Sequence, residues 1–120
     1  MVILIVDDSK TMRMIVARTL KKAGFDGHEI LQAANGVEAL QVVADKSPDV
    51  ILSDWNMPEM NGIELLKSLR EAGNSVTFGF ITTETTEDVR DLAKEQGASF
   101  FISKPFTVDK FEAQLSAVLA

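Results

Sequence analysis

The feature that most constrains the fold of this chain is a regular alternation between short apolar runs and longer segments with helical periodicity. The apolar runs cover residues 2–6, 29–33, 50–53, 78–82 and 99–103. Most of them lack alternation of apolar and polar side chains, as is typical of parallel strands covered on both faces. Five rounds of strand and helix predict an α/β fold with a five-stranded parallel sheet flanked by five helices.

The intervening segments carry apolar side chains at the spacing of amphipathic helices. The predicted stripes are Met12, Ile15, Val16 and Leu20 in the first helix, Val37, Leu40 and Ala44 in the second, Ile63, Leu66 and Leu69 in the third, Val89, Leu92 and Ala93 in the fourth, and Val108, Phe111, Leu115, Val118 and Leu119 in the fifth. Each stripe is expected to face the sheet, and the fourth helix, over residues 86–96, has the weakest one. Asn35 and Asn61, each followed by a Glu three residues later, predict N-caps. Helix ends are predicted at Gly24, Gly73 and Gly97.

Composition limits the compartment and the partners. The chain has no Cys among its 120 residues, which excludes disulfides and thiolate metal sites and favours a cytoplasmic protein. The net charge of -6 argues against nucleic-acid binding, because phosphate backbones attract basic faces. The first apolar run is too short for a signal peptide or a membrane span. We therefore expect a single domain over residues 1–120, without membrane insertion.

Polar side chains follow four of the predicted strands, at the edge where ligands bind in parallel α/β sheets. They are Asp7 and Asp8 after the first run, Asp54 after the third, Thr82 at the end of the fourth, and Lys104 after the fifth. Three carboxylates gathered there would repel one another unless a cation compensates their charge. Because the chain offers oxygen ligands, no Cys and a single His, the expected ion is a hard one such as Mg²⁺.

Such a site suits phosphoryl transfer. A divalent ion and Lys104 beside Asp54 would neutralise charge on a transferred phosphoryl group, and Thr82 would donate a hydrogen bond to one of its oxygens. The carboxylate would act as the nucleophile, and water would later release the phosphate. Taken alone, each residue also fits an ordinary role, such as a capping turn, a loop before Pro58 or a strand position. The prediction therefore depends on the whole set.

The motifs around these residues resemble the response regulator receiver domain family, and above all its single-domain chemotaxis members. The resemblance covers nearly the whole chain and is carried by Val6-Asp7-Asp8 with Thr11-Met12-Arg13, Ser53-Asp54-Trp55-Asn56-Met57-Pro58, Asn61-Gly62, Thr82-Thr83-Glu84 and Lys104-Pro105-Phe106. It implies a flavodoxin-like, doubly wound sheet with the strand order 2-1-3-4-5. It further implies a protein that catalyses only its own phosphotransfer and autodephosphorylation, and not a metabolic enzyme.

The resemblance also implies which residues bind the metal. It makes Asp54 the phosphoacceptor, and Asp8 and Asp54 direct ligands of Mg²⁺. Asp7 would act mostly through water, and the backbone carbonyl of Asn56 would add a further ligand. The phosphodonor would be a sensor histidine kinase or a His phosphotransfer protein.

The remaining implied roles concern the switch. Thr82 would close on the phosphoryl group, Lys104 would bridge to it, and Phe101 would be the aromatic switch residue. Lys104–Pro105 is expected to be a cis peptide. The signal would leave through a protein that binds the face formed by the fourth helix, the fifth strand and the fifth helix.

Four positions depart from the family pattern. Thr83 stands where a smaller residue is usual, so it is expected to narrow access to Asp54. Phe101 has no hydroxyl, so packing alone would hold its ring inward. Glu87 and Arg90 in the fourth helix replace a basic and an apolar residue of the motility members, so a flagellar target is not implied. A phosphate sink or a relay receiver stays open as an alternative.

Two rival classes fit the sequence poorly. A phosphatase of the haloacid-dehalogenase kind also uses an Asp nucleophile and Mg²⁺, but it needs two acids separated by one residue after the first strand. Here Asp7 and Asp8 are adjacent, and the acceptor follows the third strand. A nucleotide- or flavin-binding module would need glycines or hydroxyls in the first turn, where this chain has two acids that repel phosphate.

Overall fold

The computed structural model describes residues 1–119, in which strands and helices alternate strictly along the chain. The strands are β1 (Val2–Val6), β2 (Glu29–Ala33), β3 (Val50–Ser53), β4 (Thr77–Thr82) and β5 (Phe100–Ser103). The helices are α1 (Lys10–Lys22), α2 (Gly36–Lys46), α3 (Gly62–Glu71), α4 (Glu87–Glu95) and α5 (Val108–Leu119). The predicted α/β class is confirmed. The apolar runs placed the start of β4 one residue too late and the start of β5 one residue too early.

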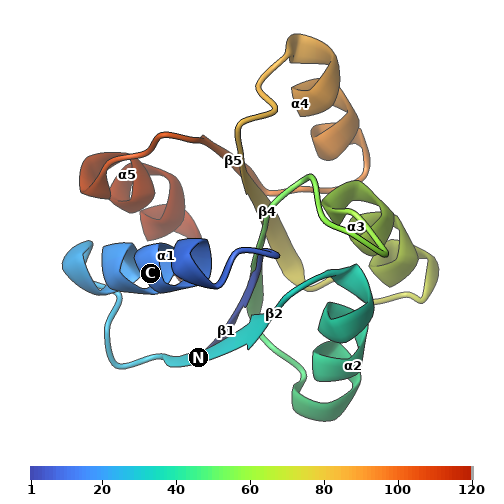
Figure 1. Ribbon diagram of the computed structural model, residues 1–120, viewed down its shortest axis with the longest axis horizontal. Coiled ribbons are helices and arrows are strands. Elements are labelled where there is room, and N and C mark those ends of the chain that lie inside the picture. The colour runs from blue at the N-terminus through green and yellow to red at the C-terminus, as the bar shows by residue number, and fades with distance from the viewer. Residues whose placement is uncertain (120) are drawn as a thin grey trace.

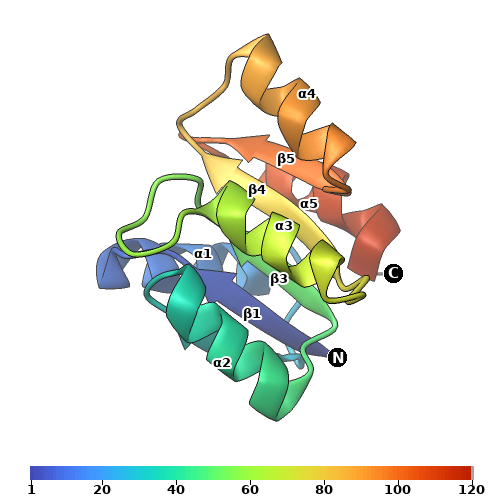
Figure 2. The same cartoon turned by 90° about the vertical axis from the view of Figure 1, so that its right-hand side faces the viewer.

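All five strands are parallel, and their order is β2-β1-β3-β4-β5, as the family resemblance implied. Helices α1 and α5 cover one face of the sheet, and α2, α3 and α4 cover the other (Figures 1 and 2). The chain therefore folds as a flavodoxin-like, doubly wound sheet. Its order reverses at β1, which lies between β2 and β3, and ligands of such sheets bind beyond the carboxyl ends of the strands at this point.

Each face of the sheet has its own hydrophobic core. In β1, Ile3 and Ile5 belong to the core under α1 and α5, while Leu4 and Val6 belong to the core under α2, α3 and α4. These four side chains are at most 1% exposed. Burying an apolar side chain of this size stabilises the fold by roughly 1.5–3 kcal/mol. Because β1 contributes to both cores, the loop that follows it starts from a rigid support.

The helix stripes are confirmed in part. In α3, the predicted residues Ile63, Leu66 and Leu69 are all buried. Three residues predicted to face the sheet are exposed instead, namely Ile15, Val37 and Ala44. In α2, the buried side consists of Ala39 together with the partly buried Leu40, Val42 and Val43, so Leu40 is the one residue of the predicted stripe that packs on the core. The side chain of Leu119 lies outside the described part of the chain.

The predicted helix ends are confirmed. Asn35 and Asn61 cap α2 and α3 by accepting hydrogen bonds from the backbone N–H groups of the third helical residues. Gly24, Gly73 and Gly97 have positive φ angles directly after the caps of α1, α3 and α4. None of the helices in residues 1–119 has the length and the apolar character needed to cross a membrane.

Candidate functional site

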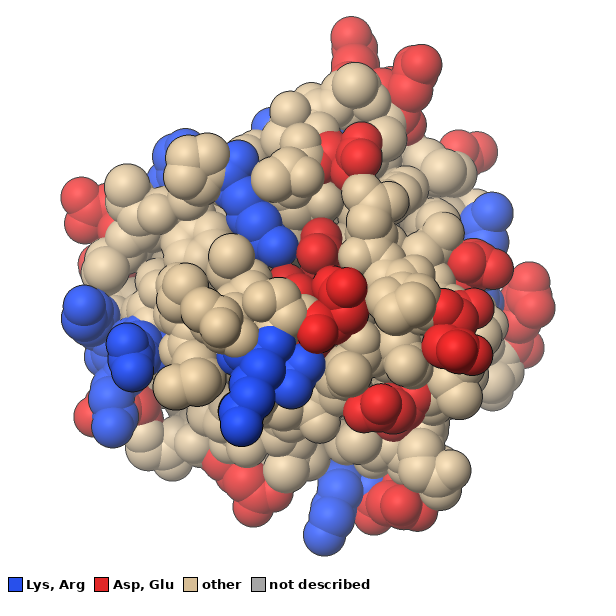
Figure 3. Space-filling view, viewed as in Figure 1, with Lys and Arg blue, Asp and Glu red and all other residues tan. Residues whose placement is uncertain are grey.

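Three carboxylates meet at the carboxyl ends of β1 and β3. Asp7 and Asp8 follow β1, Asp54 follows β3, and one oxygen from each lies within 4.8 Å of the other two. Asp7 is 4% exposed, Asp54 is half-buried and Asp8 is exposed, so the cluster opens to solvent on one side. Figure 3 shows acidic side chains near the centre of this face, with basic side chains beside them. A cluster of three carboxylates at this spacing is suited to hold a hard divalent cation.

Lys104 joins two of these carboxylates. Its Nζ lies 3.1 Å from Oδ2 of Asp7 and 3.3 Å from Oδ2 of Asp54. Lys104 directly follows β5, its backbone N–H donates to the carbonyl of Thr82 at 2.9 Å, and its peptide bond to Pro105 is cis, as predicted. From its position after β5, the lysine side chain thus reaches the carboxylates that follow β1 and β3. It supplies a fixed positive charge to an otherwise acidic cluster.

Asp54 is held by backbone contacts on both sides. Its N–H donates to the carbonyl of Val6 at 2.8 Å, and its Oδ1 accepts the N–H of Trp55 at 2.7 Å. The loop after β3 then turns back, because the N–H of Gly62 donates to the carbonyl of Trp55 at 2.8 Å. A Cβ at position 62 would overlap the carbonyl oxygen of Asp54. This close approach packs the returning loop against the backbone of Asp54.

Burial raises the pKa of Asp54 above its ordinary value of 3.8, because the charged form loses solvation. The positive charge of Lys104 opposes this rise, and the negative charge of Asp7 adds to it. The backbone N–H of Trp55, like Lys104, stabilises the charged form and lowers the pKa. An ionised Asp54 is therefore costly in the absence of a further cation, and a cation or a covalent group that removes the charge would relieve that cost.

We expect Asp54→Asn to be more stable than the wild type at neutral pH. The wild-type carboxyl keeps its proton to a higher pH in the folded protein than in the unfolded chain, so its contribution to stability falls as pH rises from 3.8 through the raised pKa. The amide has no such cost, and Lys104 keeps Asp7 as a partner. Thermal unfolding without divalent ions should show a Tm higher by a few degrees at neutral pH. A difference that does not shrink towards acid pH would contradict this assignment.

Thr82 ends β4 at the same edge and is fully buried. Its hydroxyl accepts the N–H of Glu84 at 3.1 Å. The Glu84 carboxylate in turn accepts a hydrogen bond from the side-chain amide of Asn56 at 2.8 Å. The loops after β3 and β4 are therefore tied together beside the carboxylates. Thr83, between these residues, is exposed.

Two residues at the site were quoted in the sequence motifs without a predicted role. Arg13 donates from Nη1 to the carbonyl of Asp7 at 2.6 Å and from Nε to Gln32 at 3.0 Å, which ties α1 to the end of β1. Glu84 accepts the amide of Asn56, as described above. Each is a charged residue that lies two to six positions from a site residue within the same motif, and this proximity is the signal that could have indicated both.

Phe101 lies on β5 and is half-buried. Its ring centroid is 6.2 Å from that of Phe80 in the core. Trp55 is 9% exposed and packs on Phe80 with ring centroids 4.8 Å apart. An aromatic chain thus runs from the residue after Asp54, through β4, to Phe101 on β5.

Comparisons with known proteins agree with this geometry. The family model described as the response regulator receiver domain matches residues 3–116. The chemotaxis protein CheY1 of Helicobacter pylori is 38% identical, with 99% of this chain and 97% of that protein covered. A CheY homolog of Campylobacter jejuni is also 38% identical, with 99% of this chain and 92% of that protein covered.

Solved structures show the same likeness. The chemotaxis protein CheY4 of Vibrio cholerae has a TM-score of 0.86 and 37% sequence identity, and the match covers 98% of both chains. A DNA-binding response regulator of the LuxR family from Staphylococcus aureus has a TM-score of 0.87 at 21% identity, which supports the fold alone. Sequence and structure therefore point to the same group of proteins.

Proposed function

Because this chain belongs to the response regulator receiver domain family, we propose that Asp54 accepts a phosphoryl group from the phosphohistidine of a sensor kinase or a His phosphotransfer protein. A carboxylate oxygen of Asp54 forms the new bond to phosphorus, the bond from phosphorus to the histidine nitrogen breaks, and the imidazole leaves. The observation that carries the proposal is the contact of Lys104 with both Asp7 and Asp54 beside the exposed Asp8.

We propose Mg²⁺ as the ion that these carboxylates hold. Asp8 and Asp54 would be direct ligands, Asp7 would act mostly through water, and the backbone carbonyl of Asn56 would complete the protein ligands. All of them are oxygen donors, which hard divalent ions prefer. Bound there, the ion would neutralise charge on the phosphoryl oxygens. Lys104, whose Nζ lies 3.3 Å from Oδ2 of Asp54, would bind one of these oxygens as well.

Phosphorylation adds charge at the strand ends, and we propose that Thr82 and Lys104 then draw towards the new oxygens. Thr82 would exchange its hydrogen bond with Glu84 for one to the phosphoryl group. Both residues adjoin β5, since Lys104 follows it and its N–H donates to Thr82. A shift there would reach Phe101, the proposed switch residue, and change the face formed by α4, β5 and α5.

We propose that this face binds a downstream protein of a chemotaxis or other two-component system in the cytoplasm, with residues 1–120 acting as one receiver domain. Water would hydrolyse the acyl phosphate and end the signal. A phosphate sink or a relay receiver without a motility target is the second candidate. It is favoured by Glu87 and Arg90, which differ from the basic and apolar residues of the motility members.

The experiment that tests the proposal uses Trp55, the only tryptophan of the chain. The backbone N–H of Trp55 donates to the Asp54 carboxylate, and its indole ring is buried against Phe80. We expect Mg²⁺ to change its fluorescence, beryllofluoride with Mg²⁺ to change it further, and EDTA to reverse both effects. Na⁺ at the same ionic strength separates binding from screening. Fluorescence that responds to neither addition would contradict the assignment of the site.

Thr83→Ala is expected to release phosphate severalfold faster than the wild type. The Thr83 side chain is exposed beside the loop contact between Asn56 and Glu84. A smaller side chain would leave water a wider approach to the acyl phosphate. The decay of labelled phosphate on the isolated protein measures the rate, and Thr85→Ala, also exposed in the same loop, is the matched control. An unchanged or slower decay would show that this position does not limit access.

A further inference from the structure

Arg13 links helix α1 to the first two strands through neutral oxygen atoms. Its Nη1 donates to the backbone carbonyl of Asp7 at 2.6 Å, and its Nε donates to Oε1 of Gln32 on β2 at 3.0 Å. The side chain is half-buried, and the ion pairs of residues 1–119 do not include it. The guanidinium is therefore bonded to the backbone of the site without occupying any of its three carboxylates.

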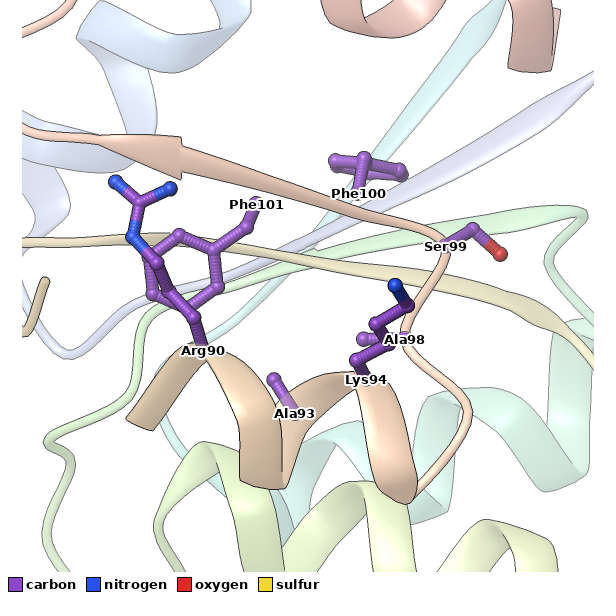
Figure 4. Close-up of a pocket in the computed structure, with 7 residues that line it drawn as sticks. All are labelled: Arg90, Ala93, Lys94, Ala98, Ser99, Phe100 and Phe101. Carbon is purple, nitrogen blue, oxygen red and sulfur yellow. The ribbon is translucent and has the colours of Figure 1, made fainter. Parts of the chain in front are cut away.

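Arg90 is held in a similar way at another place. Its Nη2 donates to the hydroxyl of Ser103 at 3.0 Å, and its Nε donates to the carbonyl of Thr85 at 3.4 Å. Its guanidinium carbon lies 5.0 Å from the centroid of the Phe101 ring, and Figure 4 shows the side chain rising from α4 beside that ring. None of these partners is one of the three acids or adjoins one in the sequence. Arg13 differs because it binds the backbone of an acid of the site.

The carbonyl that Arg13 binds belongs to the peptide bond between Asp7 and Asp8. A peptide bond is planar, so a donor fixed on its oxygen also fixes the direction of the Asp8 N–H on its other side. The following peptide bond is held as well, because the N–H of Ser9 donates to Oδ1 of Asp7 at 2.9 Å. The Asp8 carboxylate is exposed and takes part in no hydrogen bond or ion pair of the described residues. These backbone anchors are thus its fixed supports.

Gln32 fixes the direction of the Arg13 guanidinium. The next residue of β2, Ala33, accepts the N–H of Asp7 at 3.1 Å, so the strand that carries Gln32 is tied to the residue that Arg13 binds. A guanidinium is a rigid planar fork, and acceptors on both Nε and Nη1 leave it one orientation. Because the amide of Gln32 is neutral, it orients the arginine without adding another acid beside the site.

We propose that Arg13 and Gln32 form a positioning pair that sets the Asp8 carboxylate for the binding of Mg²⁺. The inference rests on the proposed function, because it assigns these residues a role toward the ion proposed there. Two effects of Arg13 oppose each other, since its charge repels a cation while its hydrogen bond holds Asp8 in place. Water and salt screen the repulsion at this open edge, whereas loss of a residue that orients a metal ligand lowers metal affinity by roughly ten- to a hundredfold. Positioning therefore outweighs charge.

Titration of Mg²⁺ into the protein, followed by Trp55 fluorescence, tests the pair. Arg13→Gln is expected to raise the dissociation constant for Mg²⁺ about tenfold, although it removes a repelling charge. Gln32→Met is expected to raise it about threefold, because this exposed residue loses only its hydrogen bond to Arg13 and no charge changes. Arg18→Gln, an equal charge change at an exposed position of α1, is the matched control and should not weaken binding.

A comparison of two ions of equal charge separates positioning from electrostatics. Mg²⁺ demands near-octahedral geometry, whereas Ca²⁺ accepts flexible geometry with more ligands. Arg13→Gln should therefore weaken the binding of Mg²⁺ several-fold more than that of Ca²⁺, with both measured by calorimetry. Thermal unfolding without divalent ions reports the stability of the variant separately, so a purely structural role of Arg13 would lower the Tm and leave the ratio of the two dissociation constants unchanged.

Several outcomes would overturn the inference. These are unchanged or tighter Mg²⁺ binding by Arg13→Gln, equal losses for Mg²⁺ and Ca²⁺, or a loss in Arg18→Gln as large as in Arg13→Gln. If Arg13→Gln does not fold, Gln32→Met decides, and an unchanged Mg²⁺ affinity of that variant would contradict the pair. A wild type that does not bind Mg²⁺ would contradict the proposed function itself, whereas a binding wild type with unaffected variants would contradict the positioning pair alone.

Discussion

Asp54→Asn is expected to lose phosphoryl transfer completely, with a rate at least roughly a thousandfold below that of the wild type. The amide cannot act as the nucleophile, and no other carboxylate takes its place. Asp7 is 4% exposed and its Oδ1 already accepts the N–H of Ser9 at 2.9 Å, while Asp8 is too exposed to be held against Lys104. Incorporation of labelled phosphate from acetyl phosphate with Mg²⁺ measures the rate.

The matched control is Asp26→Asn, which removes the same charge from an exposed position in the loop after α1. It should be phosphorylated like the wild type. The stability expected for Asp54→Asn is useful here, because a variant that unfolds at a higher temperature cannot owe its lost activity to misfolding. Phosphate incorporation into Asp54→Asn at a rate near that of the wild type would mean that another residue is the acceptor.

Gly62→Ala is expected to lower the Tm by roughly 10 °C and to impair phosphorylation. The added methyl group would overlap the carbonyl oxygen of Asp54 and approach Cε1 of Phe80 within 2.8 Å. Neither neighbour can move away easily, because Phe80 is fully buried and the backbone N–H of Asp54 donates to the carbonyl of Val6. Overpacking of this kind costs about 3 kcal/mol, which for a domain of this size corresponds to such a shift in Tm.

Gly73→Ala is the matched control for this variant. Gly62 begins α3 and Gly73 follows the C-cap of the same helix, so both variants add one methyl group next to α3. Nothing lies within 4 Å of the methyl group added at Gly73. Its only cost is the positive φ of 79°, which is about 1 kcal/mol. Differential scanning calorimetry compares the two. If Gly62→Ala were no less stable than Gly73→Ala, the tight return of the loop onto Asp54 would not be a constraint.

The fold could be predicted because local signals agreed with one another. The apolar runs marked all five strands, and the residues that cap α2 and α3 were visible as Asn with Glu three positions later. The stripe of α2 was predicted correctly only at Leu40, because the helix carries two sets of apolar residues. Val37 and Ala44 belong to one set, Val42 and Val43 to the other, and periodicity alone does not say which set the sheet covers.

The site was predictable as a set of residues but not as a set of contacts. Parallel strands bring their carboxyl ends to one edge, so the meeting of Asp7, Asp54 and Lys104 followed from their positions after strands. The contacts of Arg90 depend on which rotamer a long side chain adopts over β5, and no spacing rule gives that. Sequence alone therefore indicated where the acidic and basic side chains meet and left the contacts of Arg90 on the neighbouring face undetermined.

The ion pair between Lys104 and Asp7 joins residues 97 positions apart, and that between Lys104 and Asp54 joins residues 50 positions apart. During synthesis, a ribosome-bound chain that has released β1 to β4 would already display the acids but would lack their lysine. The ion pairs of Lys104 with Asp7 and Asp54 can therefore form only after β5 has paired with β4, so the acids are the first part of this site to be made and the lysine is the last.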